Sequence, residues 1–406
     1  MAALLVLSVP FWIRELGGAS DWRALDPDAV LSPAAREFLE DVLEPLRNAP
    51  VVDFHTHLAG VGDGSDSWVN PRMQSWLHPK DHVRFRIYRS AAGLDGEGEG
   101  ALDLRYAERL LDVIEAEPLP VRHLILAFDH RYDHAGRIDL DHSEFHVPNE
   151  FMWDVVQRNP ERLIPCISVH PYRGDALEQL TRWGKEGVRF VKWLPNAMGI
   201  DPASERCDAF YDRMVDFGMV LLTHTGEEQA VEAGADQELG NPLRLRRPLG
   251  RGVRVLAAHC ASSGQSEDLD RPGKRTSSFE LFLRLMDEPN SAGRLFGEIS
   301  TVTQLNRFGT ALETLLSRRD LHPRLVNGTD WPLPAVNVLF STRALQRAGF
   351  LTASERELLN ELYDYHPLAF DLALKRTVRA PQTGARFSAE AFQVPTELLG
   401  LIEAHK

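Results

Sequence analysis

From Pro50 onward, short apolar runs rich in β-forming residues alternate with stretches that have a helical pattern. Near-continuous apolar runs that alternate with helices are typical of buried parallel strands. Eight such units suit a closed barrel better than an open sheet, so we predict an α/β fold of the (β/α)8 TIM-barrel class. The predicted strands are 51–58, 123–130, 163–171, 187–195, 218–226, 254–262, 295–302 and 325–332.

Several connecting segments have the spacing of amphipathic helices, with one apolar and one polar face. They are 175–186, 205–217 and 308–318, together with helical pattern at 33–47 and 354–376. We therefore divide the chain into three regions. Residues 1–49 form an N-terminal apolar segment with a helical extension, 50–376 form the barrel with its C-terminal helices, and 377–406 form a tail packed on the barrel.

Two long insertions interrupt the predicted barrel, at 59–100 after the first strand and at 131–150 after the second. The first contains the polar, glycine-rich stretch GLDGEGEG. Barrel enzymes build their active sites from the loops that follow the strands. Both insertions are therefore expected on the catalytic face.

The N-terminal run at 2–13 is apolar and ends at Arg14. It is shorter than the ~20 residues that span a bilayer, and it lacks the positively charged start of a signal peptide. It is consistent with the end of a membrane anchor that starts upstream, with an export signal, or with a helix lying on the barrel. We expect a cytoplasmic location, with membrane association through 2–13 or export as alternatives.

The composition is that of a globular protein, with 43% hydrophobic and 26% charged residues among 406. The formal net charge of -14 disfavours nucleic acid as a partner, because such proteins present a basic face. The cysteines Cys166, Cys207 and Cys260 are too widely spaced for a zinc or disulfide motif. We expect a small-molecule substrate, and the sequence leaves a homo-oligomer open.

Polar residues stand near the C-terminal ends of the predicted strands, which is where barrel enzymes place their catalytic groups. In the first strand, VVDFHTHL, the spacing predicts that His55 and His57 share one face and that Asp53 lies deeper on the same face. Two imidazoles so placed can bind one metal ion. A lone HxH also occurs by chance, so the other strands decide its meaning.

The fourth, fifth, sixth and eighth strands each add one such residue, namely Lys192, His224, His259 and Asp330. Each is expected on the same face as the residue two positions before it, namely Phe190, Leu222, Ala257 and Gly328. Taken singly, each has a structural interpretation: a histidine at the rim, an aspartate that caps a turn, or a lysine that reaches outward to water. Their matching depth on successive strands favours a shared metal site. Imidazole and carboxylate ligands suit zinc, with manganese, iron or cobalt as alternatives.

A second group of residues could contact the substrate. His170 ends the third strand, His130 ends the second, Arg131 begins the second insertion, and Glu298 lies on the seventh strand. A structural role at the rim or in a solvated lid is the alternative for each of them.

The order HxH, Lys, His, His, Asp on successive strands resembles the amidohydrolase superfamily. The stretches DFHTHL, LLTHTG, AAHC and NGTDWP are similar to its amidohydrolase-related branch. That branch includes metal-dependent hydrolases, lactonases, aromatic-acid decarboxylases and enzymes similar to aminocarboxymuconate-semialdehyde decarboxylase. The resemblance covers about residues 50–375 and leaves out residues 1–49 and both insertions.

The resemblance implies a role for each matching residue. His55, His57 and His224 bind the metal, and Asp330 binds or flanks it and takes a proton from its water. His259 binds a second metal or polarises the substrate. Lys192 matches a position that is a carboxylated, metal-bridging lysine in some members. We expect one metal, because the motifs resemble the mononuclear branch, and two if Lys192 is carboxylated.

These residues lead to three hypotheses about function. The first is hydrolysis of a lactone, ester or amide, because a divalent metal lowers the pKa of its bound water to ~7 and Asp330 can act as general base. The alternative is non-oxidative decarboxylation of a small, often aromatic, carboxylic acid. The third is a barrel that binds a ligand without catalysis.

Overall fold

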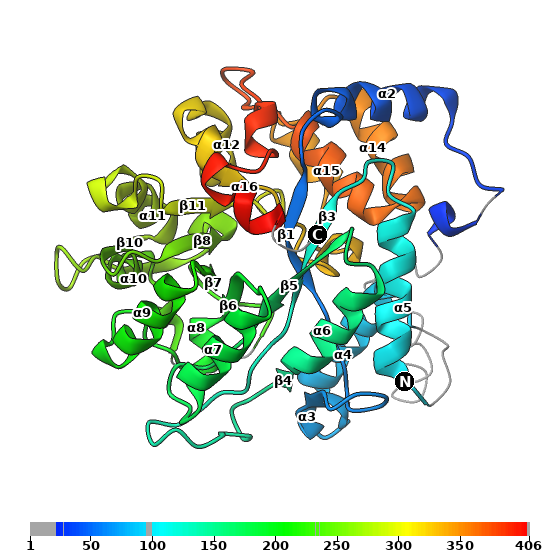
Figure 1. Cartoon of the computed structure of the whole chain (residues 1–406). Coiled ribbons are helices and arrows are strands. Elements are labelled where there is room, and N and C mark those ends of the chain that lie inside the picture. The colour runs from blue at the N-terminus through cyan, green and yellow to red at the C-terminus, as the bar shows by residue number, and fades with distance from the viewer. Residues whose placement is uncertain (1–21, 27, 95–99, 232, 235, 404–406) are drawn as a thin grey trace.

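The computed structural model describes residues 22–26, 28–94, 100–231, 233–234 and 236–403. Its main sheet has eight strands in the order β1-β3-β5-β6-β7-β8-β11-β12, and neighbouring strands run parallel (Figure 1). The strands are β1 (Val52–His57), β3 (Arg122–Leu126), β5 (Leu163–Ile167), β6 (Phe190–Trp193), β7 (Val220–His224), β8 (Arg254–Ala258), β11 (Leu295–Glu298) and β12 (Leu325–Val326).

Backbone hydrogen bonds between β1 and the segment that directly follows β12 close this sheet into a barrel. The Phe54 amide donates to the Asn327 carbonyl at 2.9 Å, and the Asp330 amide donates to the His55 carbonyl at 2.7 Å. The predicted (β/α)8 barrel is thereby confirmed, and each of the eight predicted runs overlaps one of its strands, with β3 beginning one residue before its run. The predicted runs extend beyond the observed strands mainly at their C-terminal ends, where the backbone leaves the ladder.

Helices surround the barrel, and they confirm the predicted helical segments. Thus α7 (Ala176–Lys185) fills 175–186, α9 (Asp208–Asp216) lies in 205–217, and α12 (Thr310–Ser317) lies in 308–318. The other α-helices are α2 (Pro33–Leu43), α3 (Pro71–Gln74), α4 (Pro79–Ala91), α5 (Leu102–Glu115), α6 (Asn149–Arg158), α8 (Pro195–Met198), α10 (Arg246–Gly250), α11 (Ser278–Asp287), α13 (Thr342–Arg347), α14 (Ala353–Tyr365), α15 (Pro367–Thr377) and α16 (Thr396–Glu403).

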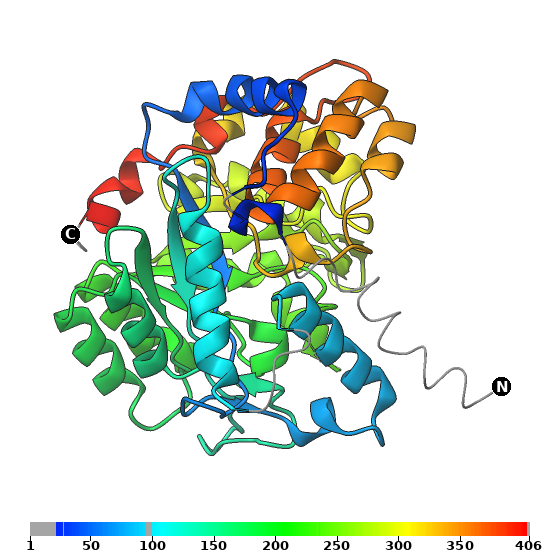
Figure 2. The ribbon, with the colours of Figure 1, turned by 90° about the vertical axis from the view of Figure 1, so that its right-hand side faces the viewer.

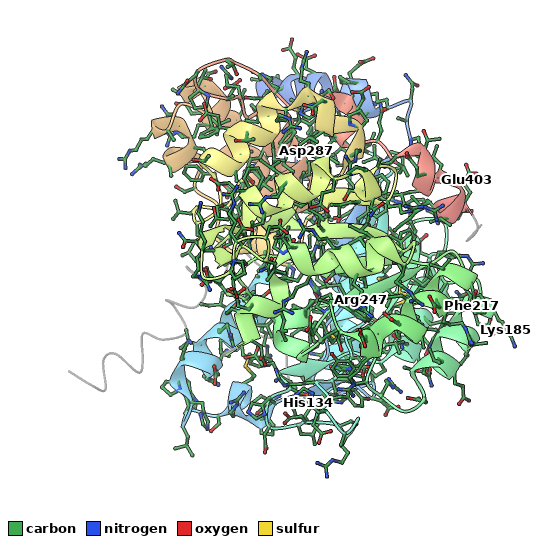
Figure 3. All side chains as sticks on the ribbon, turned by 90° about the vertical axis from the view of Figure 1, so that its left-hand side faces the viewer. His134, Lys185, Phe217, Arg247, Asp287 and Glu403 are labelled. Atoms are coloured by element: carbon green, nitrogen blue, oxygen red, sulfur yellow. The ribbon has the colours of Figure 1, made fainter. Side chains whose placement is uncertain are left out.

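Short 3-10 helices join many of these elements. They are η1 (Arg23–Leu25), η2 (Glu44–Leu46), η3 (Glu205–Cys207), η4 (Asp236–Gly240), η5 (Pro242–Leu245), η6 (His259–Ala261), η7 (Pro289–Ser291), η8 (Arg319–Arg324), η9 (Leu333–Ala335) and η10 (Ala389–Ala391). The outer helices carry the surface charge, with Lys185 on α7 and Arg247 on α10 among the side chains labelled in Figure 3. Arg247 is paired there with Asp208 at 2.7 Å.

The predicted helical region 354–376 is divided into two helices at Pro367. A capping box formed by Thr352 and Glu355 begins α14, and the His366 side chain accepts a hydrogen bond from the Ala369 amide at the start of α15. Proline is favoured in the first turn of a helix but not in its interior. The chain therefore turns at His366 instead of continuing as one helix.

Inside the barrel, apolar side chains form a buried plug below the polar mouth. Val52 and Phe54 of β1 pack there with Phe190 of β6 and Leu222 of β7. The same cluster includes Leu398 of α16, so the C-terminal helix packs against the plug. With one end filled in this way, the polar strand ends are left at the other.

The two insertions, 59–100 and 131–150, meet over the polar mouth, and together we call them the cap. The first contains α3 and α4, and its strand β2 (Trp68–Val69) pairs antiparallel with β4 (Phe145–His146) of the second. Figure 2 shows α3 and α4 at the opposite end of the molecule from α2. A second antiparallel pair, β9 (Gln265–Glu267) with β10 (Arg275–Ser277), follows the sixth barrel strand.

Among the residues that the structure describes, none of the helices combines the length and the apolar character that crossing a bilayer requires. The apolar run at 2–13 lies outside the described residues. Part of the GLDGEGEG stretch, at 95–99, lies outside them as well.

His123 of β3 lies in a buried network of charges behind β1. Its Nε2 is 2.8 Å from Glu117 Oε2, and its Nδ1 is 3.5 Å from Asp53 Oδ2. Burial lowers the pKa of His123, but the two carboxylates outweigh burial and raise the pKa to about 9. The protonated imidazolium is thus the form that this network stabilises.

This network predicts a stability that falls as the pH rises. An unfolded histidine has a pKa of about 6.5, so between there and pH 9 the native chain holds a proton that the unfolded chain has lost. The contribution is fully present below the unfolded pKa, amounts to about 3 kcal/mol, and is lost as the pH passes the native pKa. Denaturant midpoints from pH 6 to 10 measure it against His123→Gln, and parallel curves for the two proteins would contradict the assignment.

Candidate metal centre

Six residues predicted from the sequence come together at the polar mouth. All of them line one cavity of about 200 Å³. The side chains come from the ends of β1, β6 and β7 and from the segments that follow β8 and β12. They are His55, His57, Lys192, His224, His259 and Asp330.

Asp330 is the common neighbour of three of the histidines. Its Oδ1 is 3.1 Å from His57 Nε2 and 3.4 Å from His55 Nε2, and its Oδ2 is 3.8 Å from His259 Nε2. Burial raises the pKa of Asp330, but the three imidazoles together outweigh burial and hold the pKa well below its usual range. Asp330 is therefore an ionised carboxylate with three imidazole nitrogens around it.

One oxygen and two nitrogens form a candidate ligand set for a metal ion. One ligand atom from each of His55, His57 and Asp330 lies within 4.8 Å of the others. Burial lowers the pKa of His57 to about 4, against the opposing effect of Asp330. His57 is thus neutral at pH 7, which is the form that binds a metal.

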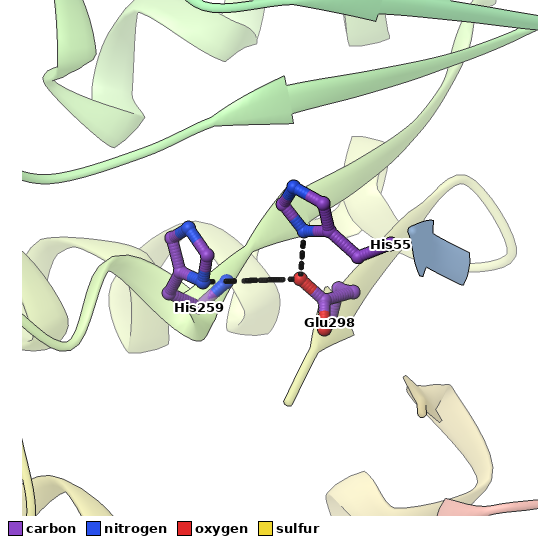
Figure 4. Close-up of side chains that lie close together, drawn as sticks. All are labelled: His55, His259 and Glu298. Carbon is purple, nitrogen blue, oxygen red and sulfur yellow. Dashed lines mark hydrogen bonds and ion pairs between the residues drawn. The ribbon is translucent and has the colours of Figure 1, made fainter. Parts of the chain in front are cut away.

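Glu298, at the end of β11, orients His55 from behind. Glu298 Oε2 lies 2.9 Å from His55 Nδ1 (Figure 4). A carboxylate on Nδ1 keeps the proton there and leaves Nε2 free for a metal, as outer partners of metal-binding histidines commonly do. Glu298 is fully buried and is held in turn by the Ser300 backbone amide and hydroxyl.

His55, His259 and Glu298 form a second group close enough to hold an ion (Figure 4). Its facing atoms, however, are already engaged by the chain. His55 Nδ1 is bonded to Glu298, and His259 Nδ1 is 2.7 Å from Ser300 Oγ. We therefore interpret this group as the support of the site, and the first set as its metal-facing side.

His224 offers a further nitrogen to the cavity. Its Nδ1 is 3.1 Å from Glu228 Oε2, whereas its Nε2 is buried without a hydrogen-bond partner. Burial lowers the pKa of His224 to about 4, although Glu228 opposes this. A buried nitrogen lone pair with no partner is costly unless something binds it. The site residues therefore fit a divalent metal with nitrogen and oxygen ligands.

Lys192 places its amine in the mouth beside His55. Its Nζ is 2.8 Å from His55 Nε2, and the side chain is buried. Burial lowers the pKa of Lys192, with Asp330 opposing. The amine and a metal compete for the same His55 nitrogen, so loading requires that Lys192 move, lose its proton or be carboxylated.

Two of the predicted side-chain directions were wrong, both for reasons of backbone geometry. The register of β1 shifts between Asp53 and Thr56, so Phe54 faces the barrel interior while Asp53 turns to Thr329 and His123. Asp53 is therefore not below His55 and His57 on one face. An irregularity of one residue is enough to exchange the two faces of a strand.

The sixth strand differs from its prediction in the same way. Ala258, rather than Ala257, packs in the barrel interior. His259 reaches the cavity because the backbone leaves the strand there with a φ of 60°. Its Nδ1 contacts the hydroxyls of Ser300 and Thr301 at 2.7 and 3.0 Å. For Lys192 and His224 the predicted alternation is confirmed, since Phe190 and Leu222 lie in the interior.

The structure does not bring the other candidates to this cavity. Both ring nitrogens of His170 are used by the chain: Nε2 is 2.9 Å from the Met198 carbonyl, and Nδ1 accepts from the Tyr172 amide. Arg131 pairs with Asp236 at 2.6 Å. These bonds hold both side chains in the wall of the molecule rather than at the reacting centre.

His130 and Glu298 also lie outside the cavity lining. The ring of His130 stacks on His146 with 4.1 Å between centroids, in the segment that joins the second strand to the cap. Glu298 lies behind His55, so its place in the structure is that of an orienting group rather than a substrate contact.

Sequence reasoning missed Glu228 and Thr301. Glu228 follows His224 by four positions, but in a loop rather than a helix, so no periodicity pointed to it. Thr301 has a φ of 56°, which a threonine rarely adopts and which the sequence did not indicate.

Glu228 gives a test of the orientation of His224. Replacing Glu228 by Gln removes the charge that holds the proton on Nδ1, so we expect the affinity for zinc to fall by about 10- to 100-fold. Competition with a chromophoric chelator measures the affinity. The neighbouring Glu227→Gln is the control and is expected to bind zinc as the wild type does. Equal affinities of the two variants would contradict the role of Glu228.

No family model and no curated protein matches the chain. Among solved structures, an uncharacterised TIM-barrel protein from Bordetella bronchiseptica is 15% identical over 71% of this chain and 88% of its own, with a TM-score of 0.47. A putative 2-pyrone-4,6-dicarboxylic acid hydrolase from Pseudomonas putida is 15% identical over 80% and 98%, with a TM-score of 0.42.

A manganese-bound 5-carboxyvanillate decarboxylase from Novosphingobium aromaticivorans is 10% identical over 88% of this chain and 98% of its own, with a TM-score of 0.45. Hydrolases and decarboxylases thus both stand among the similar structures. Because the identities and TM-scores are low, we base the fold on the strand order of the chain itself and transfer no activity.

Proposed function

We propose that this protein is a metal-dependent hydrolase of the amidohydrolase superfamily that acts on an ester, lactone or amide. The observation that carries the proposal is the position of Asp330. One of its oxygens lies beside His55 and His57, and the other lies on the side of His259. A carboxylate so placed can bind or flank a metal ion held by His55 and His57 with one oxygen and exchange a proton with the other.

The chain's own residues supply the steps around the metal. A bound divalent ion would supply a Lewis acid and an acidified water molecule. His55, His57 and His224 would hold it. Glu298 fixes the tautomer of His55, and Glu228 fixes that of His224. Asp330 takes the proton of the attacking water and returns it to the leaving group.

His259 has a separate part in the proposal. Its Nε2 faces the Asp330 side of the cavity, while the Thr301 hydroxyl can donate to its Nδ1. In that tautomer Nε2 carries a proton, and it donates a hydrogen bond to the substrate carbonyl oxygen. A donor placed where negative charge develops lowers the barrier of acyl transfer.

The test combines metal analysis of the purified chain with a parallel assay of esters, lactones, amides and aromatic acids. We expect a divalent metal near one equivalent per chain, and hydrolysis that incorporates ¹⁸O from labelled water into the acid product. Release of carbon dioxide from an aromatic acid, with no incorporation of water, would replace the proposal with a decarboxylase. Carefully prepared protein that takes up no metal would refute both enzymes.

A further inference from the structure

The walls of the cavity differ in chemistry from its floor. The floor is the polar group of histidines with Lys192 and Asp330, whereas the walls above it are mainly aliphatic and aromatic. Much of this wall comes from the two insertions that meet through β2 and β4. Six of its side chains are Val61, Val69, Met73, Phe85, Leu94 and Phe145.

The charged residues in the wall bind the chain rather than the cavity. Glu144 forms an ion pair with Arg84. Asp103 is buried and accepts hydrogen bonds from the backbone amides of Val61 and Gly62. The Arg89 Nε donates to the Leu94 carbonyl at 3.2 Å. The wall carboxylates and Arg89 thus have partners within the protein.

The tyrosines of the wall are engaged in the same way. The Tyr88 hydroxyl donates to the Ala230 carbonyl at 3.1 Å, and the Tyr106 hydroxyl donates to the His57 carbonyl at 2.8 Å. Their rings face the cavity as apolar surface while their polar atoms are satisfied elsewhere. The upper part of the cavity therefore offers a ligand packing area and few hydrogen bonds.

We infer that the substrate is an uncharged molecule with a compact apolar body, such as one aromatic ring or a short acyl chain, and a single polar reacting group. This inference rests on the proposed hydrolase. The apolar body packs against the cap wall, and the reacting carbonyl lies on the polar floor. The cavity of about 200 Å³ is smaller than the roughly 300–1,000 Å³ of drug-sized ligand sites, which limits the body in size.

The cation in this wall is Arg89, which is already engaged with the chain through contacts that include the Leu94 carbonyl. A carboxylate on the far end of such a substrate would therefore have to displace these contacts to gain a counter-charge. Burying an ionised group without a partner is far more costly than burying a methyl group of similar size. Molecules that carry acids at both ends are therefore expected to bind more weakly than those with an apolar far end. The two insertions of the cap, rather than the barrel strands, set this preference.

A matched pair of ketones tests the inference without turnover, because a hydrolase does not cleave a ketone. The pair is 4-methylacetophenone and 4-acetylbenzoate, which share a carbonyl for the floor and differ only in a distal methyl or carboxylate. Isothermal titration of the full-length, zinc-loaded chain is expected to give at least tenfold tighter binding of 4-methylacetophenone. Equal binding, tighter binding of 4-acetylbenzoate, or binding of neither would overturn the inference.

A variant locates the preference in the cap. Val61→Thr with Val69→Thr adds two hydroxyls to the wall at nearly constant volume, and we expect 4-methylacetophenone to bind about tenfold more weakly. Val338→Thr makes the same change at an exposed position, and is expected to bind as the wild type does. Unchanged binding by the double variant would overturn the inference. Absence of hydrolysis with the ketone preference intact would instead refute only the proposed reaction.

Discussion

Replacing Asp330 by Asn is expected to lower the turnover of a hydrolysed ester by roughly 10²- to 10⁴-fold, the usual contribution of a general base. The amide keeps the shape of the carboxylate and one oxygen that can contact the ligand set, but it cannot accept a proton. Asp330 has the geometry for this role because its two oxygens face different histidines. Steady-state kinetics on protein of measured zinc content gives the comparison.

The metal content separates the two roles of Asp330. If the variant binds zinc as the wild type does and is inactive, the loss belongs to proton transfer. If it has lost zinc, its main role is that of a ligand. Asp320→Asn, at an exposed position on η8, is the control and should have wild-type kinetics. A fully metallated Asp330→Asn protein with wild-type hydrolysis would refute the assignment.

Replacing Asp371 by Asn is expected to lower the free energy of unfolding at pH 8.5 by about 3–5 kcal/mol, because it leaves a buried charge without its partner. Burial raises the pKa of Asp371 to about 7 although Lys375 opposes this, so the carboxylate is ionised at that pH. Lys375 Nζ is fully buried, and it bonds to Asp371 Oδ2 and to the Gly328 carbonyl. Gly328 lies two residues before Asp330. The ion pair therefore holds the segment that presents the proposed base.

A double variant distinguishes the cost of the unpaired charge from loss of the pair itself. Asp371→Asn with Lys375→Met removes both charges at similar volume, and it is expected to recover more than half of the lost stability. Urea unfolding of both single variants and of the double variant measures the cycle. Equal losses for Asp371→Asn and the double variant would contradict the argument.

Much of the barrel and of its mouth could be predicted, because both follow from local pattern. Eight buried strands give apolar runs, and a residue two positions beyond an inward side chain is also inward while the strand stays regular. This reasoning placed Lys192 above Phe190 and His224 above Leu222, as the structure has them. The strand ends themselves were less predictable, since β8 and β12 stop before His259 and Asp330.

The parts that could not be predicted depend on contacts between distant segments. The irregularity in β1 and the left-handed backbone at His259 break the alternation without any signature in the residues. Glu298 and Glu228 are assigned to His55 and His224 only once the strands stand side by side. The apolar wall arises where two insertions pair, and neither insertion shows it alone.

The closure of the barrel by β12 and β1 has a consequence for how the protein is made. The segment bearing His55 and His57 leaves the ribosome well before Asp330 and the strand that completes the barrel. Contacts between such distant segments form slowly, because a long loop of chain must be closed first. Until that strand is in place the nascent chain lacks the complete candidate site, and a metal ion bound there, as proposed, would favour the closed barrel over the open one.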